Sequence, residues 1–204
     1  MWDKITVGQF QAIYKISIDK EADEMEKVSG IISILYNKTL AQVDEMSIVD
    51  FNKLASRCTA FLNIENIPGR PVKYLKAGGK RYFINYDASK LKHRQYVEVQ
   101  HFGGNPIENM HLILASIVQP VRFFIKVKNR ADMHKKIAND LLGARMVDVY
   151  HSCVFFCKVY QSSIQSLLPY LELQLKNKGL KKKETKALLT YLQNDLGGFI
   201  PQGR

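Results

Sequence analysis

Residues 95–120 read QYVEVQHFGGNPIENMHLILASIVQP, and this stretch sets the centre of the predicted fold. Gly103-Gly104 predicts the end of one helix, because glycine readily adopts the conformations that terminate helices. Asn105-Pro106 then offers an N-cap followed by proline at the first helical position, and Pro120 marks the end of the second helix. We therefore predict two helices joined by a Gly-Gly-Asn-Pro corner that fixes the angle between them.

On the N-terminal side, residues 1–63 are predicted to form a small helical unit. Thr6-Val-Gly-Gln9 has the form of a capping box, in which the threonine and glutamine side chains satisfy backbone N–H groups at a helix start. A second helix is expected after Asp19, because an acidic first turn suits the positive end of the helix dipole. A third is expected to open at Ser47-Ile-Val-Asp50. Apolar residues recur every three or four positions after each start, as in an amphipathic helix.

Residues 64–87 are predicted to be a Pro/Gly linker followed by a β-hairpin. The linker IENIPGRP contains two prolines and a glycine, which rule out a continuing helix. In VKYLKAGGKRYFINY, which follows, alternating apolar and polar residues flank Gly78-Gly79, whose freedom at positive φ suits a tight turn. An isolated hairpin is marginal in water, so it should pack on helices or pair with a neighbouring strand.

Residues 88–204 are predicted to form a C-terminal helical bundle, either separate from residues 1–63 or in one domain with them. Its first helix should be capped by Asp87 or Ser89, although its β-branched and aromatic centre also fits a strand. VRFFIKVK is either a short strand or an extended link. Further helices are predicted over residues 129–143, 144–179 and 180–198. The expected fold class is mainly α, a multi-helix bundle with one β-hairpin insertion.

Positive charge is concentrated in the later part of the chain. The 204 residues carry a net charge of +11, but residues 1–70 hold 8 Lys/Arg against 10 Asp/Glu, whereas residues 71–204 hold 22 against 9. Such a basic surface attracts nucleic acid, anionic membranes or acidic proteins. The N-terminus lacks the pattern of a secretory signal and no apolar run is long enough to span a membrane, so the chain is expected to be soluble. Three cysteines are too few for a secreted disulfide framework, which indicates synthesis in a reducing cytoplasm.

Three acid-x-x-His pairs raise the question of a metal site. They are Glu98 with His101, Glu108 with His111, and Asp148 with His151. An offset of three residues places both side chains on one helix face, as in carboxylate-bridged di-iron proteins. Such a site also needs further carboxylates turned inward from other helices, and the remaining acids do not lie in apolar runs. We therefore favour the interpretation that these pairs border packed helices.

Other motifs for chemistry are weak. Cys153 and Cys157 lie four residues apart among apolar residues, so we interpret them as small side chains on a buried helix face rather than zinc ligands. The glycine pairs lack the further residues of nucleotide-binding loops, and no serine lies in a nucleophile-elbow motif. No residue is assigned to catalysis, to a cofactor or to a metal, and the chain is predicted not to be an enzyme.

Basic residues supply the candidate contact sites for a partner or a nucleic acid. The lysines of residues 176–186 form the densest charge run, and the hairpin places cations beside tyrosines that could stack on bases. The alternative is a solvated helix start and a charged hairpin edge that discourages strand pairing. The candidate contact residues are Lys73, Lys76, Lys80, Arg81, Tyr82, Lys181, Lys182 and Lys183.

The order of these features resembles a known group of proteins. The pattern Arg-Tyr-x-x-x-x-Asp in the hairpin precedes an Asn-x-His-x-Ile-Leu-Ala helix that ends in proline. These positions are Arg81, Tyr82, Asp87, Asn109, His111, Ile113, Leu114, Ala115 and Pro120. Over residues 80–200 the order is similar to that of small helical proteins encoded among the tail and neck genes of tailed bacteriophages. The resemblance implies a virion component, or a tail or baseplate assembly factor, without catalytic residues.

Three hypotheses follow from these patterns. The first is a non-enzymatic virion or tail-assembly protein that contacts other tail, neck or capsid proteins, forms a ring or other oligomer, and reaches the virion after synthesis in the host cytoplasm. The second is a nucleic-acid-binding accessory protein that uses the basic hairpin and the lysine run. The third is a carboxylate-bridged metalloenzyme built on the acid-x-x-His pairs.

Overall fold

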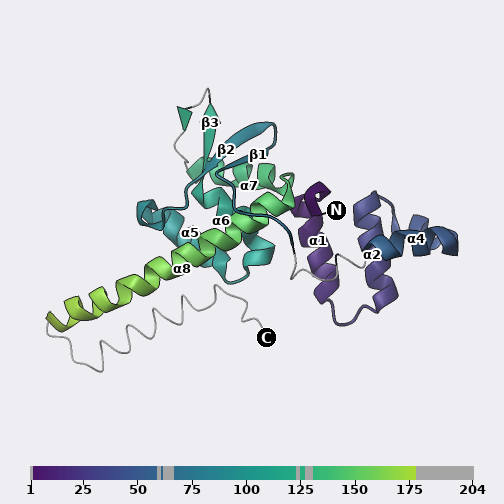
Figure 1. The fold of residues 1–204 in the computed structure, drawn as a ribbon, viewed down its shortest axis with the longest axis horizontal. Coiled ribbons are helices and arrows are strands. Elements are labelled where there is room, and N and C mark those ends of the chain that lie inside the picture. The colour runs from purple at the N-terminus through teal and green to yellow at the C-terminus, as the bar shows by residue number, and fades with distance from the viewer. Residues whose placement is uncertain (1, 59–60, 62–66, 123–124, 127–130, 178–204) are drawn as a thin grey trace.

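The computed structural model describes residues 2–58, 61, 67–122, 125–126 and 131–177 of the chain, with side chains through residue 166 apart from residue 126. Helices dominate this part of the molecule, and a small antiparallel sheet of order β1-β2-β3-β4 lies along one side of it, next to α7 (His134–Leu142) (Figure 1). The prediction of a mainly α fold with a β-hairpin is therefore confirmed. The hairpin is extended by two further short strands.

Local capping chemistry starts the N-terminal helices. Thr6 and Gln9 form the predicted capping box at α1, with the Gln9 N–H donating to Thr6 Oγ1 at 3.2 Å. Asp23 and Glu26 do the same at α2, so this helix begins four residues later than Asp19 suggested. Ser47 accepts from the backbone N–H of Asp50 at the start of α4, as predicted. The bounds are Val7–Ile18 for α1, Glu24–Tyr36 for α2 and Ile48–Cys58 for α4.

One short helix in this region was not predicted. Helix α3 spans Leu40–Asp44 and has a capping box of its own, in which the backbone N–H of Gln42 donates to the hydroxyl of Thr39 at 3.2 Å. The sequence Thr-Leu-Ala-Gln has the same form as the box that correctly predicted α1, so the signal was present. The helix is only five residues long, too short for apolar periodicity to reveal it.

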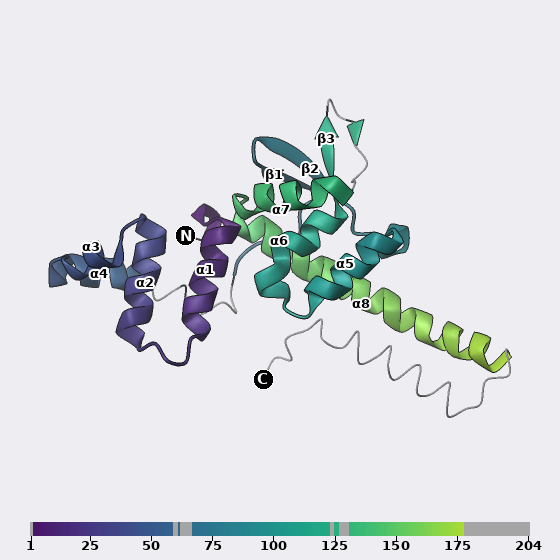
Figure 2. The same ribbon diagram turned by 180° about the vertical axis from the view of Figure 1, so that it is seen from behind.

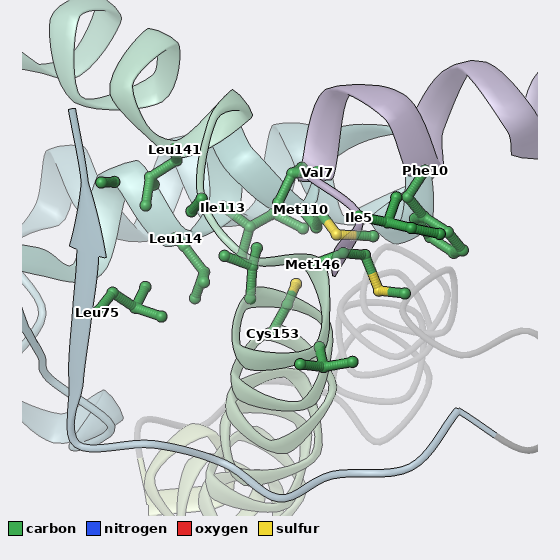
Figure 3. Packing of buried hydrophobic residues seen from close by; sticks show 14 of the residues in the cluster. Ile5, Val7, Phe10, Leu75, Met110, Ile113, Leu114, Leu141, Met146 and Cys153 are labelled. Carbon is green, nitrogen blue, oxygen red and sulfur yellow. The ribbon is translucent and has the colours of Figure 1, made fainter. Parts of the chain in front are cut away.

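The Gly-Gly-Asn-Pro corner joins two helices at the centre of the fold. Helix α5 spans His93–Gly103 and α6 spans Pro106–Ile117, as the glycines and proline indicated. Helix α6 packs against α1, α5, α7 (His134–Leu142) and α8 (Met146–Asn177). Its side chains Met110, Ile113 and Leu114 meet residues of α1 and α8 in the core, as Figure 3 shows. Complete burial of each such side chain stabilises the fold by about 1.5–3 kcal/mol.

Two predicted boundaries around these helices are wrong. Asp87 caps a separate 3-10 turn, Ala88–Lys90, and α5 starts only at His93. At the other end α6 stops at Ile117, and Pro120 lies within strand β3, Val118–Arg122, rather than at the end of the helix. Proline is tolerated there because β4 pairs with β3 only from Val121 onward, so Pro120 has a strand partner on one side alone among the described residues.

The sheet is built on the predicted hairpin. Strand β1 spans Tyr74–Ala77, β2 spans Lys80–Ile84, and the two-residue β4, Ile125–Lys126, completes the order. Gly78 and Gly79 have φ of 53° and 68°, the left-handed values that a two-residue hairpin turn requires. The hairpin both pairs with β3 and lies against helix α7, as its marginal intrinsic stability demanded.

The last two described helices follow the sheet in the chain and contact the N-terminal segment. Helix α7 spans His134–Leu142 and α8 spans Met146–Asn177, while the helix predicted over residues 180–198 lies outside the described residues. The short segment between α7 and α8 pairs with the start of the chain: the Val7 N–H donates to the Ala144 carbonyl at 3.0 Å, and the Met146 N–H donates to the Ile5 carbonyl at 2.8 Å. Helix α1 thus contacts the C-terminal helices as well as α2.

Candidate interaction surface on the β-sheet

The two-residue turn decides which hairpin side chains lie on each face of the sheet. It sets the register Ala77↔Lys80, so that the next pairs are Lys76↔Arg81, Leu75↔Tyr82 and Tyr74↔Phe83. Side chains alternate between the two faces along each strand. One face is buried against the helices, and the other is open to solvent (Figures 1 and 2).

The open face, which we call the outer face, carries Tyr74, Lys76, Arg81 and Phe83. The Arg81 guanidinium lies over the Tyr74 ring, 4.2 Å from its centroid, in a cation–π contact. Tyr74 and Phe83 meet edge to face with centroids 5.7 Å apart. Lys76 and Arg81 are exposed, and neither forms an ion pair within the part of the chain that the structure describes. The outer face therefore combines two cations with two aromatic rings.

The buried face holds Tyr82, which was predicted to contact a partner. Its side chain is 1 % exposed, and its hydroxyl donates to Asp140 Oδ2 on α7 at 2.5 Å. The same carboxylate oxygen accepts from the Lys80 ammonium at 2.5 Å. Tyr82 is thus a buried anchor rather than a contact residue. Tyr74, on the neighbouring strand, lies on the outer face instead. The register set by the Gly78-Gly79 turn, together with the alternation of side chains along each strand, would have predicted this difference.

Hydrogen bonding at Asp140 shifts the acidity of both partners. Burial by itself raises the pKa of Asp140, but the hydrogen bonds from Lys80 and Tyr82 hold that pKa below its usual value. Burial, reinforced by the carboxylate, raises the pKa of the Tyr82 phenol. Both groups therefore keep their usual charge states near neutral pH, with a neutral phenol bound to a carboxylate.

The other predicted contact residues fall in different places. Lys73 precedes β1 and is exposed, and its backbone carbonyl accepts from the Ile84 N–H. Lys181, Lys182 and Lys183 lie outside the described residues, so the lysine run stays a prediction. The sequence-based prediction did not include Tyr74 and Phe83, which complete the outer face. It selected residues by their charge and did not use the strand register of the β1–β2 hairpin.

The first of the acid-x-x-His pairs separates in the structure. One carboxylate oxygen of Glu98 accepts from the Arg94 guanidinium, one turn back on α5. The other lies 3.9 Å from His134 Nε2 and is buried, with no hydrogen-bond partner among the described residues. His101 is exposed and meets the ring of Phe102 edge to face. Glu98 therefore faces α7 rather than its sequence neighbour.

The second pair is involved in helix packing. The buried amide of Gln11 on α1 donates to the backbone carbonyl of Glu108 at 2.5 Å and lies 3.0 Å from His111 Nδ1. Burial, and to a smaller extent the nearby His134, lowers the pKa of His111. The imidazole is therefore held neutral, with Nδ1 placed to accept from the glutamine amide.

The third pair also finds separate partners. Asp148 accepts two hydrogen bonds from the Arg145 guanidinium, at 2.8 and 2.7 Å. His151 Nε2 lies 3.1 Å from the carbonyl oxygen of Ile67 in the linker. Across the described ranges, no three side chains of His, Cys, Asp or Glu gather in a way that would hold a metal ion.

Ser116, His134 and Glu98 include the residue types of a catalytic triad, but their geometry differs from one. Ser116 Oγ and the carbonyl of Leu112 both lie 3.1 Å from His134 Nε2, the same nitrogen that faces Glu98. In a triad the serine and the acid bind opposite nitrogens of the imidazole. Ser116 is also 0 % exposed. The three side chains form a partly buried polar contact among α5, α6 and α7.

The cysteines are buried thiols. Cys153 and Cys157 are almost fully buried on α8, which confirms the predicted buried face. A hydrogen bond with Cys157, together with burial, raises the pKa of Cys153 well above its usual value. Burial raises the pKa of Cys58 to about 11. Cys58 and Cys153 therefore stay protonated at neutral pH and are poor nucleophiles.

Comparison with protein-family models, with curated proteins and with solved structures found no match for this chain. In the segments that the structure describes, no helix has both the length and the apolar character needed to cross a bilayer. The residues themselves therefore carry the functional argument.

Proposed function

We propose that this chain is a non-enzymatic structural or assembly component of a tailed-bacteriophage virion, acting through contacts with other protein subunits. The setting rests on the order in the sequence of the Arg-Tyr hairpin, the Asn-x-His helix and Pro120, which follows that helix within strand β3. The observation that carries the mode of action is a concentration of exposed aliphatic side chains between residues 40 and 49.

These side chains are Leu40, Ile48 and Val49, which are 56, 67 and 74 % exposed. They begin α3 and α4, which lie beyond α2 on the side away from the sheet (Figures 1 and 2). A single exposed apolar side chain is ordinary, but several in a short projecting segment are typical of a protein contact site. Burying them against a partner removes apolar surface from water, which favours association.

The long helix α8 supports an assembly role. Its 32 residues correspond to a length of about 48 Å, and both ribbon views show it extending well past the bundle (Figures 1 and 2). It packs on α6, and its exposed apolar side chains include Val154 and Phe155. A projecting helix offers a subunit a surface for a second copy or for a neighbouring protein, as a ring or other oligomer requires.

In this proposal the partners are other tail, neck or capsid proteins, and the protein reaches the virion after synthesis in the host cytoplasm. No catalytic step is included, because the one serine, histidine and acid cluster described above lacks triad geometry. The proposal covers both a subunit built into the particle and an assembly factor that acts before completion, since both use the same kind of contact.

Mass spectrometry of purified particles that carry this gene tests the proposal directly. We expect peptides of the chain in a fixed ratio to the portal protein, or in the case of an assembly factor, a stable complex with a tail or neck protein in infected cells. A monomeric protein that is absent from particles and binds none of the tail, neck or capsid proteins would refute the proposal.

A matched pair of variants tests the carrying observation. The double variant Ile48→Ser, Val49→Ser is expected to reduce the assembled fraction in size-exclusion chromatography with light scattering. Ile125→Ser is the control, because Ile125 is 70 % exposed but lies on the sheet. Equal loss of assembly in both variants would show that residues 40–49 have no special role.

A further inference from the structure

The outer face of the sheet places two like charges directly opposite each other. Lys76 and Arg81 are Cα partners in the antiparallel pair β1–β2. Like charges in this position repel and destabilise a sheet. Within the described residues no carboxylate pairs with either side chain, whereas the neighbouring Lys80 is neutralised by Asp140 on the other side. An anion bound over the outer face would relieve this repulsion.

The cations stand beside flat aromatic surface. The Tyr74 and Phe83 rings lie on the same face, 5.7 Å apart, and Arg81 rests on the Tyr74 ring. This contact restricts the Arg81 side chain before any ligand arrives, so less conformational entropy is lost when its guanidinium binds a phosphate. Aromatic rings and arginine planes both stack on nucleobases.

The shape of this surface favours a single strand over a duplex. Four strands at their usual spacing span about 14 Å across the sheet, which is wider than the major groove of B-DNA at about 12 Å. The whole outer face therefore cannot lie flat in that groove. The bases of a duplex are already stacked on one another, whereas those of a single strand are free to stack on the two rings. An acidic protein segment would use the cations but would leave the paired rings without a role.

We propose that Tyr74, Lys76, Arg81 and Phe83 form a binding site for single-stranded nucleic acid. Lys76 and Arg81 bind successive phosphates, and the two rings stack against bases. The site holds groups for phosphates and bases, which DNA and RNA share, so the ligand class is a single strand of either. This inference goes beyond the proposed assembly role, and either one stands if the other fails.

Fluorescence anisotropy on the full chain tests the site, with labelled oligothymidine, oligouridine of equal length, a duplex and a polyglutamate peptide as probes. We expect the single strands to bind and the affinity to fall as salt rises. Arg81→Ala and Lys76→Ala should each reduce the slope of log K against log salt by about 0.7. Tyr74→Leu and Phe83→Leu should each weaken binding about fivefold or more.

Two controls separate this site from general attraction to a basic protein. Lys158→Ala removes an exposed lysine from α8 and should leave the affinity and the salt slope unchanged. The second control is a triple variant, Lys181→Ala, Lys182→Ala, Lys183→Ala. Adding Phe83→Leu to it should weaken binding of the single strands by the same factor as in the unaltered protein. Circular dichroism checks that each variant is folded, and the exposed Arg81→Ala remains a test if a ring variant unfolds.

Several results would overturn the proposal. The first two are no binding of either single strand at low salt, and tighter binding of the duplex or of polyglutamate than of the single strands. The other two are an equal loss of affinity in Lys158→Ala and Arg81→Ala, and complete loss of binding in the triple lysine variant while the outer-face variants still bind. If the single strands bind as expected, the ratio of the affinities for oligothymidine and oligouridine shows whether the site prefers DNA or RNA.

Discussion

Asp140 is expected to fasten the sheet to the helical body, and Asp140→Ala is the change that tests this. Its carboxylate accepts from the buried Tyr82 hydroxyl and from the Lys80 ammonium, each at 2.5 Å. It also lies against the hairpin turn, because a Cβ built on Gly78 would come within 2.4 Å of Asp140 Oδ1. A single residue of α7 thus contacts three positions of the hairpin.

The two hydrogen bonds at Asp140 have unequal value. The Tyr82 bond joins a buried donor to a charged acceptor, and such bonds contribute about 1.5–3 kcal/mol. The Lys80 side chain is 44 % exposed, so its ion pair is screened by solvent and contributes about 1 kcal/mol or less. We expect Asp140→Ala to lower the free energy of unfolding by about 2–3 kcal/mol, Tyr82→Phe by about 1.5 kcal/mol, and Lys80→Ala by less than about 1 kcal/mol.

Urea denaturation of the single and double variants measures these values. Tyr82→Phe combined with Asp140→Ala should cost less than the sum of the two, with a coupling energy of about 1–2 kcal/mol. A loss of about 2 kcal/mol should also lower Tm by about 4–8 °C for a protein of this size. Because the pKa of Asp140 is lowered in the fold, its contribution is present above the usual value of 3.8 and is lost as pH falls through its folded pKa. A coupling energy between Tyr82 and Asp140 below about 0.5 kcal/mol, the value at which two substitutions count as additive, would refute the inference that their hydrogen bond holds the sheet on α7.

Three further predictions concern single positions. Because the pKa of His111 is lowered in the fold, the free energy of unfolding should decline as pH falls below the usual histidine value of 6.5. In His111→Gln, urea denaturation should show a free energy of unfolding that depends less on pH in this range. Gly78→Ala should lower Tm more than Gly79→Ala, because both have positive φ but only Gly78 has a neighbouring atom that blocks a Cβ; equal shifts would contradict this. Cys58 and Cys153 should react with a thiol reagent only as fast as the protein unfolds, and rapid labelling of the native state would show that they are accessible.

The features that the sequence predicted well depend on neighbouring residues. The capping box at Thr6 and the turn at Gly78-Gly79 form from side chains and backbone within a few positions, so their chemistry is legible in the sequence. Residues 121–128 were left open as a short strand or an extended link, and β3 and β4 each include part of them. The start of β3, residues 118–120, was not predicted, because Pro120 is a helix terminator by local rules and only pairing with β2 makes this part a strand.

The candidate site was only partly predictable for the same reason. Lys76 and Arg81 could be chosen from their charge, and the two-residue turn contained enough information to place Tyr74 and Phe83 beside them. The role of Tyr82 could not be found in this way. Its partner, Asp140, lies 58 residues away and belongs to a helix whose docking on the hairpin has no local signature.

The pairing of residues 5–7 with residues 144–146 has a consequence for synthesis of the protein on the ribosome. The hydrogen bonds that join Ile5 to Met146 and Val7 to Ala144 connect segments separated by about 140 residues of chain. At about 5–20 residues per second, the first segment waits about 7–28 s for its partner to be made. During that interval the buried side of α1, including Val7 and Phe10, has no C-terminal helices to cover it. Nascent chains that stop before Met146 are therefore expected to expose this surface and to be the species that chaperones and proteases recognise.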